Sequence, residues 1–399
     1  MSDTTTATAG PLSGIKVIDF SVMISGPLAA MQLADQGADV IKVESPGLGD
    51  IMRYLGTQKN GMTGIFANNN RGKRSIVVDL KHADGLDVVK RLVADADVVI
   101  QNFRPGAMDR LGLGYEQLSE LNSDLIYTSI SGYGADGPNS GRRVYDNVIQ
   151  AASGLASVQA NPATGEPELF RTLLCDKTTA YTTTQAITAA LFARATGRAA
   201  GQHLEVAMLD TAIAFMWPDS AMDAALLDDD VMRSPTIAAN YGVTRLADGF
   251  AASSAVTDSE FTGLCAALGR PDIADDPRFV DTPTRIANAS EMVPLLAEVA
   301  AERGIEEFVA ASAEHDVPSS PINSLDDLPT DAQVLHNDVF VTRQHPQAGT
   351  IREPRPAARF SATPQRVSDV APAVGQHTDD IVSSLGLDPA ALRSAGAIA

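Results

Sequence analysis

Strand-length apolar runs alternate with helical stretches through the first third of the chain. Of all the features of the sequence, this alternation restricts the possible folds most. Strands are predicted at 15–20, 38–44, 75–80, 97–103 and 125–131, and helices at 27–36, 83–94 and 115–121. Strands that are apolar on both sides and separated by helices predict a parallel sheet covered on both faces, an α/β doubly wound domain. Ligands bind at the carboxyl ends of such strands, which here carry Ser21, Glu44, Asn102 with Phe103, and Ser131 with Tyr133.

The rest of the chain predicts a second, smaller domain. Antiparallel strands are expected around the turn at 247–249, with amphipathic helices at 259–268, 291–303 and 305–315. We therefore predict a large domain over 1–225, a small α+β domain over 230–335, and a C-terminal segment, 340–399, that returns to the large domain. The Pro-rich part of this segment, 345–364, predicts an extended path, followed by a helix near 377–385.

Charge and composition exclude several classes of protein. The net charge of −20 over 399 residues argues against a nucleic-acid partner. Residues 1–14 show neither the basic region nor the apolar run of a signal peptide, and no run reaches the roughly 18 apolar residues of a membrane span. Two cysteines and six scattered histidines predict no disulfide framework and no metal site. These features predict a cytoplasmic protein without a membrane partner.

One window of this acidic chain is basic. Residues 51–114 hold ten Lys or Arg against six Asp or Glu, so the window carries about +4. Such an island predicts a site for a small polyanion. Lys90 and Arg91 fit the solvated face of a helix, whereas five basic residues are predicted in loops and available to bind: Arg71, Lys73, Arg74, Arg104 and Arg110.

Asp176 is the candidate nucleophile. It is the one acidic residue between Glu168 and Glu205, at the start of a small-residue, apolar and hydroxyl segment that predicts a buried helix. A carboxylate with little access to water has a raised pKa and is more nucleophilic. The alternative is structural, because Asp is also a preferred N-cap.

Two further motifs suggest other chemistry. The sequence GYGADG at 132–137 matches G-x-G-x-x-G, but Pro138 and a loop follow where a dinucleotide site requires a helix. Its glycines are expected to let the backbone pass close to another group. Cys175 lies beside Asp176, but a thiol nucleophile needs a positioned base, and the nearest histidine in the sequence is His203. A small buried hydrophobe is the favoured interpretation of Cys175.

Several short motifs, in order, resemble the family III CoA-transferases, also called the CaiB/BaiF family, which include formyl-CoA transferases, carnitine CoA-transferases and 2-methylacyl-CoA racemases. The motifs are LSGIKVIDF (12–20), SGPL (25–28), GADVIKVE (37–44), GKRSI (72–76), NFRPG (102–106), YDNVIQA (145–151), ADG (247–249), LGRP (268–271) and DPRF (276–279). The resemblance covers nearly the whole chain. It implies a Rossmann-like domain plus a small domain, and a homodimer of two interlocked rings.

The resemblance also implies a reaction. Asp176 matches the family's nucleophile, which attacks an acyl-CoA to give an aspartyl–acyl anhydride and then an enzyme–CoA thioester. The partners would be an acyl-CoA and a free carboxylic acid, with CoA as a substrate and no permanently bound cofactor. Positions that match the family's CoA contacts are Val78, Lys81, Asn102, Phe103 and Arg110. To the CoA site we also assign Lys73, Arg74 and Arg104 from the basic window, and Met23 and Tyr133 near the strand ends.

Two alternatives stay open. A 2-methylacyl-CoA racemase would transfer a proton at C2, but the racemase histidine is replaced here by Tyr145, which leaves that reaction without its obvious base. A non-catalytic acyl-CoA-binding protein is the other alternative. Where formyl-CoA transferases carry a glutamine near the active site we align Ile24, and this apolar residue predicts an acyl group larger and less polar than oxalate.

Overall fold

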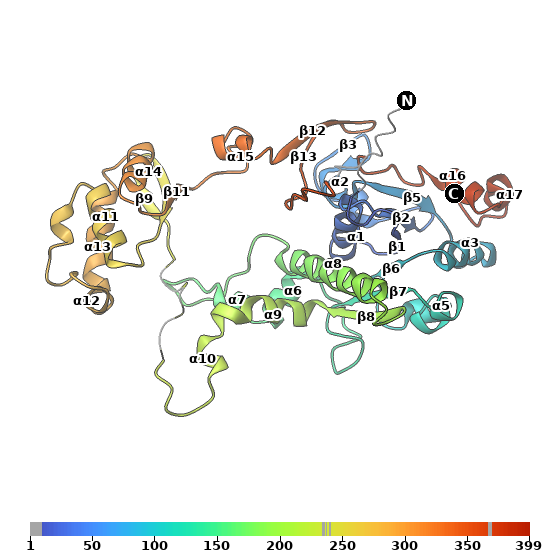
Figure 1. Ribbon diagram of the computed structural model, residues 1–399, viewed down its shortest axis with the longest axis horizontal. Helices are drawn as coiled ribbons and strands as arrows, with labels where there is room; N and C mark the ends of the chain where they lie inside the picture. Colours follow the sequence, from blue (N-terminus) through green and yellow to red (C-terminus); the bar gives the residue numbers. More distant parts are fainter. Residues whose placement is uncertain (1–9, 234–235, 237, 239–240, 366–368) are drawn as a thin grey trace. The chain divides into compact units, whose positions relative to one another are not determined.

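The computed structural model describes residues 10–399 except 234, 235, 237, 239, 240 and 366–368. Most of the segment 1–14, which lacks the features of a signal peptide, therefore lies outside the described residues. The chain divides into two compact units, one from 1–232 with 338–399 and one from 233–337. Figure 1 labels most of their helices and strands.

A six-stranded sheet forms the centre of the first unit, and all its neighbouring strands are parallel. In spatial order the strands are β5 (Lys73–Val77), β2 (Asp39–Glu44), β1 (Lys16–Asp19), β6 (Val98–Gln101), β7 (Ile126–Ser131) and β8 (Gln202–Ala207). The order reverses between β1 and β6, as in Rossmann-like sheets. The predicted doubly wound α/β fold is confirmed, although β5 begins two residues before the predicted strand.

Helices cover both faces of this sheet (Figure 1). The described helices of this unit are α1 (Ser25–Asp35), α2 (Gly64–Asn70), α3 (Ala83–Ala94), α4 (Ala107–Arg110), α5 (Tyr115–Leu121), α6 (Asp146–Ala152), α7 (Leu155–Val158), α8 (Leu174–Ala195), α9 (Met208–Ser220), α10 (Met222–Ala225), α16 (Thr378–Ser384) and α17 (Pro389–Ser394). Helices α3 and α5 have the predicted bounds. A 3-10 turn, η1 (Ile51–Arg53), and two hairpins complete the unit: β3 (Gln58–Lys59) with β4 (Met62–Thr63), and β12 (Phe340–His345) with β13 (Gly349–Pro354).

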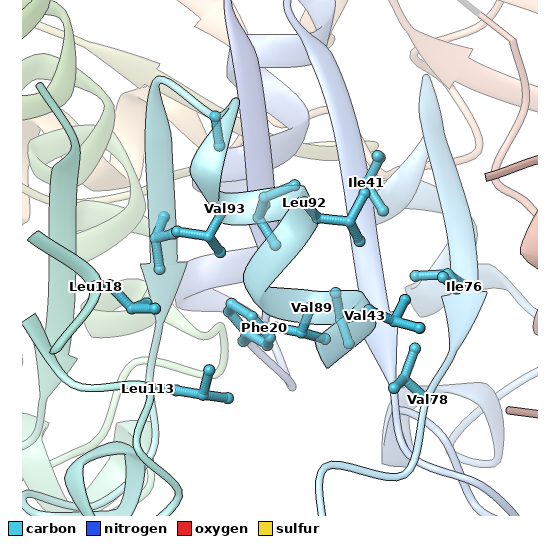
Figure 2. Packing of buried hydrophobic residues seen from close by; sticks show 14 of the residues in the cluster. Phe20, Ile41, Val43, Ile76, Val78, Val89, Leu92, Val93, Leu113 and Leu118 are labelled. Atoms are coloured by element: carbon cyan, nitrogen blue, oxygen red, sulfur yellow. The ribbon is translucent and has the colours of Figure 1, made fainter. Parts of the chain in front are cut away.

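The apolar strands contribute side chains to two hydrophobic cores, one on each face of the sheet, because successive side chains of a strand point to opposite faces. Val17 of β1 packs with α1 and α8, whereas its neighbour Ile18 packs on the side of α3 and α5. Figure 2 shows the second core, where Val89 and Leu92 of α3 lie against strand residues such as Ile41. Burial on both sides is the reason that these strands lack the polar alternation of a half-exposed sheet.

The second unit is built around an antiparallel sheet. Its strands run in the order β11 (Ser319–Pro321), β10 (Gly249–Ser253) and β9 (Thr244–Leu246), and the β9–β10 turn is the one predicted at 247–249. Its helices are α11 (Asp258–Ala267), η3 (Pro271–Ile273), α12 (Thr282–Ala287), α13 (Ala289–Ala300), α14 (Ile305–Glu314) and α15 (Ala332–His336).

The C-terminal segment packs within the first unit. The isolated backbone bridge between Val78 and Ile398 attaches the chain end to the residue after β5. The hairpin β12–β13 occupies 340–354, so the first part of the predicted extended path contains the hairpin turn and the strand β13.

Candidate functional site

A pocket of about 300 Å³ opens at the carboxyl ends of β1, β6 and β7. It brings together segments that are far apart in the sequence, since it is lined by the loop after β1, the loop after β6, the loop before α6 and the start of α8. Its lining includes Met23, Ser25, Asn102, Phe103, Arg104, Ser131, Arg142, Arg143, Tyr145 and Asp176. Four of the predicted CoA-binding residues therefore share one pocket with the predicted nucleophile.

Asp176 is the third residue of α8, largely buried, and it faces this pocket. Burial is the main cause that raises the pKa of the Asp176 carboxyl to about 7, and the nearby carboxylate of Asp146 adds to the shift. Hydrogen bonds from the side chain and backbone of Ser25 act in the opposite direction because they favour the charged form. The carboxylate is thus about half ionised at pH 7 and more basic than an ordinary aspartate.

The pKa of Asp176 is raised although the residue lies in the first turn of α8, where the helix dipole acts to lower it. A helix N-terminus typically stabilises a nearby carboxylate by about 0.3–1 kcal/mol, which lowers its pKa. A rise from 3.8 to about 7 corresponds to roughly 4 kcal/mol in the other direction. Desolvation together with the charge of Asp146 therefore outweighs the helix dipole.

Asp146 is the capping group of α8. The N-cap residue Leu173 provides no side-chain hydrogen bond, and the backbone N–H of Asp176 instead donates to Oδ2 of Asp146 at 2.9 Å. Gln150 donates to the other oxygen of Asp146 and accepts the N–H of Phe170 at 2.9 Å, which attaches the segment before α8 to α6. Asp176 is therefore not an N-cap, and the structural alternative considered for it is wrong.

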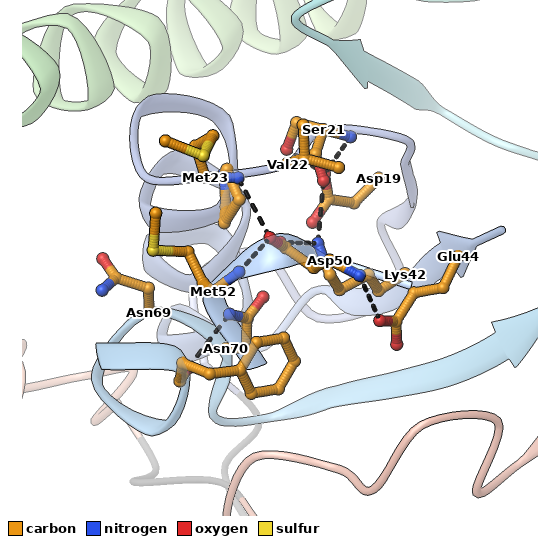
Figure 3. Close-up of polar contacts among 12 residues, drawn as sticks. Asp19, Ser21, Val22, Met23, Lys42, Glu44, Asp50, Met52, Asn69 and Asn70 are labelled. Atoms are coloured by element: carbon orange, nitrogen blue, oxygen red, sulfur yellow. Dashed lines mark hydrogen bonds and ion pairs between the residues drawn. The ribbon is translucent and has the colours of Figure 1, made fainter. Parts of the chain in front are cut away.

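The loop after β1 is held by a buried network of charges (Figure 3). Met23 has the unusual φ of 70°, and its N–H donates to Oδ1 of Asp50 at 3.2 Å. The second oxygen of Asp50 lies 3.0 Å from the ammonium of Lys42, which also donates to the carbonyl of Ser21 at 2.8 Å. These contacts fix the strained backbone that leads into Ser25.

Lys73 belongs to the same network, and the prediction that it contacts CoA is wrong for this arrangement. Its ammonium is fully buried and donates to Asp19 Oδ2 at 2.8 Å, to Asn70 Oδ1 at 2.7 Å and to the carbonyl of Pro27 at 2.8 Å. An ammonium has three protons, so no donor remains for a phosphate. Lys73 was also predicted in a loop, but it begins β5.

Arg74 is a second correction. It lies on β5 rather than in a loop, and its guanidinium forms a two-pronged pair with Asp39, at 3.0 and 2.6 Å. Asp39 is the first residue of β2. Because the strands are parallel, Arg74 lies at the amino edge of the sheet, opposite the pocket of Asp176.

The remaining predicted CoA contacts lie around the pocket rather than in it. Val78 is fully buried directly after β5, and Lys81 is exposed a few residues further on, at the carboxyl edge. Arg110 is exposed at the end of α4 and is helical rather than in a loop. Tyr133 packs against the apolar cluster around Ile149 and Cys175. None of these four lines the Asp176 pocket.

Asn102 and Phe103 do line the pocket. Asn102 accepts the N–H of Val22 at 2.9 Å and donates to the Val22 carbonyl at 2.7 Å, so it ties the loop after β6 to the loop after β1. The N–H of Phe103 donates to Oε1 of Gln101 at 2.8 Å. Both groups of the Asn102 amide are therefore bonded to the Val22 backbone, and they hold together the two loops that line the pocket.

The glycine motif and Cys175 play structural roles. No helix follows 132–137 until α6, as the loop interpretation predicted. A Cβ on Gly132 would lie 2.4 Å from Cγ2 of Val144, so the glycine permits the close approach of the loop that leads to α6. The thiol of Cys175 is buried, and burial raises its pKa to about 12, which makes it a poor nucleophile.

Four residues of the site were not assigned a role from the sequence: Ser25, Arg142, Arg143 and Asp146. Ser25 and Asp146 lie inside the family motifs, and this membership was the one sequence signal that could have pointed to them. Their contacts with Asp176 could not be read from the sequence, because these residues lie 151 and 30 positions away from Asp176. Ile24 is buried against Met52 and does not line the Asp176 pocket. Its apolar character is therefore no guide to the acyl group.

Within the described ranges, no helix combines the length and apolarity needed to cross a membrane. In the same part of the chain, no group of three or more His, Cys, Asp or Glu is placed to hold a metal ion.

Comparison with known proteins decides the family. The sequence model of CoA-transferase family III matches residues 12–378. The chain belongs to this family. It is 35% identical to the succinate–glutarate CoA-transferase of Agrobacterium fabrum, over 94% of this chain and 96% of the relative. It is also 33% identical to the succinyl-CoA:glutarate CoA-transferase of Mus musculus, over 94% and 86% of the two chains.

A solved structure supports the same assignment. The crystal structure of a CaiB/BaiF family protein from Brucella suis superposes with a TM-score of 0.84 at 33% identity, covering 94% of this chain and all of that one. The protein is thus an enzyme of the family III CoA-transferases.

Proposed function

We propose that this family III enzyme transfers CoA from an acyl-CoA to a free carboxylic acid with Asp176 as the covalent nucleophile. The observation that carries the proposal is the carboxylate of Asp176, which lies in the pocket at the sheet edge, largely removed from water, with a pKa raised to about 7. A carboxylate of this kind is basic enough to attack a thioester and is still about half ionised at pH 7.

The proposed reaction has four steps. The Asp176 carboxylate attacks the thioester carbonyl, which forms a mixed anhydride and releases CoA thiolate. The thiolate attacks the aspartyl carbonyl, which forms an aspartyl–CoA thioester and frees the first acid. The carboxylate of the second acid attacks this thioester and forms a new anhydride, and the thiolate then attacks the acyl carbonyl. The products are a new acyl-CoA and the free Asp176 carboxylate.

CoA is proposed to lie across the carboxyl edge of the sheet, with Lys81, Arg104 and Arg110 near its phosphates. All three side chains are exposed, and they follow β5 and β6 at the edge where parallel sheets bind ligands. The relatives described above are named for succinyl-CoA or succinate and glutarate. These acids are dicarboxylic, and both names describe CoA transfer to a carboxylate.

The test of this function is the covalent intermediate. Incubation with a competent acyl-CoA should add the acyl mass to the peptide that carries Asp176, and hydroxylamine should convert the adduct to a hydroxamate. Asp176→Asn should show neither adduct nor turnover. Exchange of the C2 proton of a chiral acyl-CoA with deuterated solvent, without acyl transfer to any acid, would instead establish the racemase alternative.

We also propose that two copies form the interlocked homodimer of the family. Helices α8 and α9 pack together and expose four aromatic side chains: Tyr181, Phe192, Phe215 and Trp217 are between 45% and 64% exposed. Exposed aromatic groups of this kind are typical of protein interfaces. Two chains that thread around each other should remain dimeric on sizing down to nanomolar concentration, and a monomer–dimer equilibrium at micromolar concentration would contradict interlocking.

A further inference from the structure

Three arginines line the Asp176 pocket without a partner among the described residues. Arg104, Arg142 and Arg143 are exposed, and the described part of the chain places no carboxylate in an ion pair with any of them. Several other arginines of this unit are paired, as Arg53 is with Glu44 at 2.7 Å. Three free guanidinium groups in a chain of net charge −20 indicate a pocket built to receive an anion.

Arg142 and Arg143 are carried on a loop whose backbone is fixed. The N–H of Arg142 donates to the carbonyl of Asn139 at 2.9 Å, and Val144, the next residue after Arg143, packs tightly against Gly132. Two residues further on, Asp146 holds the N–H of Asp176. The loop is therefore anchored to the nucleophile's own helix while its two guanidinium groups stay open to the pocket.

The sheet order separates these two arginines from the residues proposed for CoA. Lys81 follows β5 and Arg110 follows β6, whereas Arg142 and Arg143 follow β7. The pocket of Asp176 lies between, at the ends of β1, β6 and β7. If the CoA phosphates lie over β5 and β6, the acyl group continues beyond the thioester in the opposite direction, toward the β7 side.

The volume of the pocket agrees with this arrangement. About 300 Å³ accommodates a small acid and the thioester end of the CoA arm, not the nucleotide. A small acid with a single carboxylate would place that group at Asp176, where it reacts. A second anionic group on the same acid is what would engage the unpaired guanidinium groups.

We propose that Arg142 and Arg143 bind the distal carboxylate of a dicarboxylic substrate while its proximal carboxylate, or its thioester, reacts at Asp176. The inference rests on the proposed function and specifies its substrate class. Arginine suits this role because its planar fork donates two parallel hydrogen bonds to a carboxylate. Asp176 is the one acidic side chain among the described lining residues, so the distal carboxylate meets little opposing charge.

The experiment compares acceptor acids of matched length in the full-length enzyme. With one acyl-CoA donor, kcat and KM are measured for glutarate, for its half-amide, in which a neutral amide replaces the distal carboxylate, and for valerate. The test variant is Arg142→Gln with Arg143→Gln. Arg104→Gln is the matched comparison, because it removes a guanidinium from the same pocket on the side proposed for CoA. Arg91→Gln, on the exposed face of α3, is the inert control.

We expect the wild type to prefer glutarate over the half-amide, and the double variant to lose that preference by 10-fold to 100-fold, through KM for the acid. Arg104→Gln should instead raise KM for the acyl-CoA equally with every acceptor. An unchanged preference in the double variant, with weaker acyl-CoA binding, would show that Arg142 and Arg143 hold CoA phosphates and would overturn the inference.

Direct binding separates this inference from the proposed function. Calorimetric titration of glutarate and of its half-amide, with CoA present, requires no turnover. Tighter binding of glutarate that disappears in the double variant would support the inference even if Asp176 formed no adduct. Equal binding of both acids to the wild type would overturn it even if Asp176 were acylated by monocarboxylic donors.

Discussion

Replacing Asp176, the proposed nucleophile, by Asn should make the protein more stable while it abolishes turnover. The native structure keeps the Asp176 carboxyl largely buried next to Asp146, so the charged form is unfavourable there. Asn has nearly the same shape and can still accept the hydrogen bond from the backbone N–H of Ser25, but it never carries the charge. The substitution therefore removes the free-energy cost of holding a charged carboxylate in a buried position. The proposed reaction needs that charge, but folding does not.

The size of the effect follows from the raised pKa. Between the ordinary value of 3.8 and the folded value of about 7, the native state holds a proton that the unfolded state has lost. The penalty is absent below pH 4, grows by about 1.4 kcal/mol per pH unit, and is complete above pH 7. Its ceiling is roughly 4 kcal/mol, and local relaxation around the carboxylate reduces this to about 2–4 kcal/mol.

The assay is thermal or urea unfolding of the wild type and Asp176→Asn between pH 5 and pH 8. The stability advantage of the variant should increase with pH up to about 7 and then level off. Asp136→Asn, at an exposed loop position, is the control for removing one acidic charge from an acidic chain. A variant that is less stable than the wild type at pH 8, or an advantage that does not change with pH, would refute the reasoning.

Three further predictions concern the same unit. Ser25→Ala removes a hydrogen bond that favours ionised Asp176, so the rise of kcat/KM with pH, expected near pH 7 in the wild type, should move to higher pH; an inflection that stays in place would contradict this. Lys73→Met leaves Asp19 buried without its partner and should lower stability by about 3–5 kcal/mol in urea unfolding, whereas a loss below 1 kcal/mol would indicate a solvated site. Lys81→Ala should weaken CoA binding by about 1–3 kcal/mol in calorimetry, less so at high salt, and unchanged affinity would place the phosphates elsewhere.

The layered α/β fold was predictable because its signal is local. Inner strands of the central sheet such as β1 and β6 are apolar on both faces, and helices such as α3 show one apolar face, so short windows of sequence reveal the elements. Boundaries were less predictable where a polar residue is buried. Lys73 and Arg74 were expected in a loop because basic residues rarely enter a strand, but ion pairs to Asp19 and Asp39 allow them to do so.

The candidate site was predictable only in part. Asp176 is conspicuous in the sequence as an isolated carboxylate at the start of a small-residue helix, and the structure places it in a pocket with four of the predicted CoA residues. Nothing in the sequence separated Lys73, whose ammonium is consumed by internal contacts, from Arg104, whose guanidinium faces the pocket. Both are basic residues in the same window, and only their contacts distinguish them.

The sequence by itself determined the alternation of strands and helices, the family and the candidate nucleophile, because these depend on residue type and on spacing along the chain. The tertiary structure decided the electrostatics. It placed Ser25 and Asp146 beside Asp176, buried the carboxylate, and left Arg142 and Arg143 at the pocket without an ion pair to any described residue. A pKa and an ion pair depend on distances and on solvent exposure, and folding sets both between residues that the sequence keeps far apart.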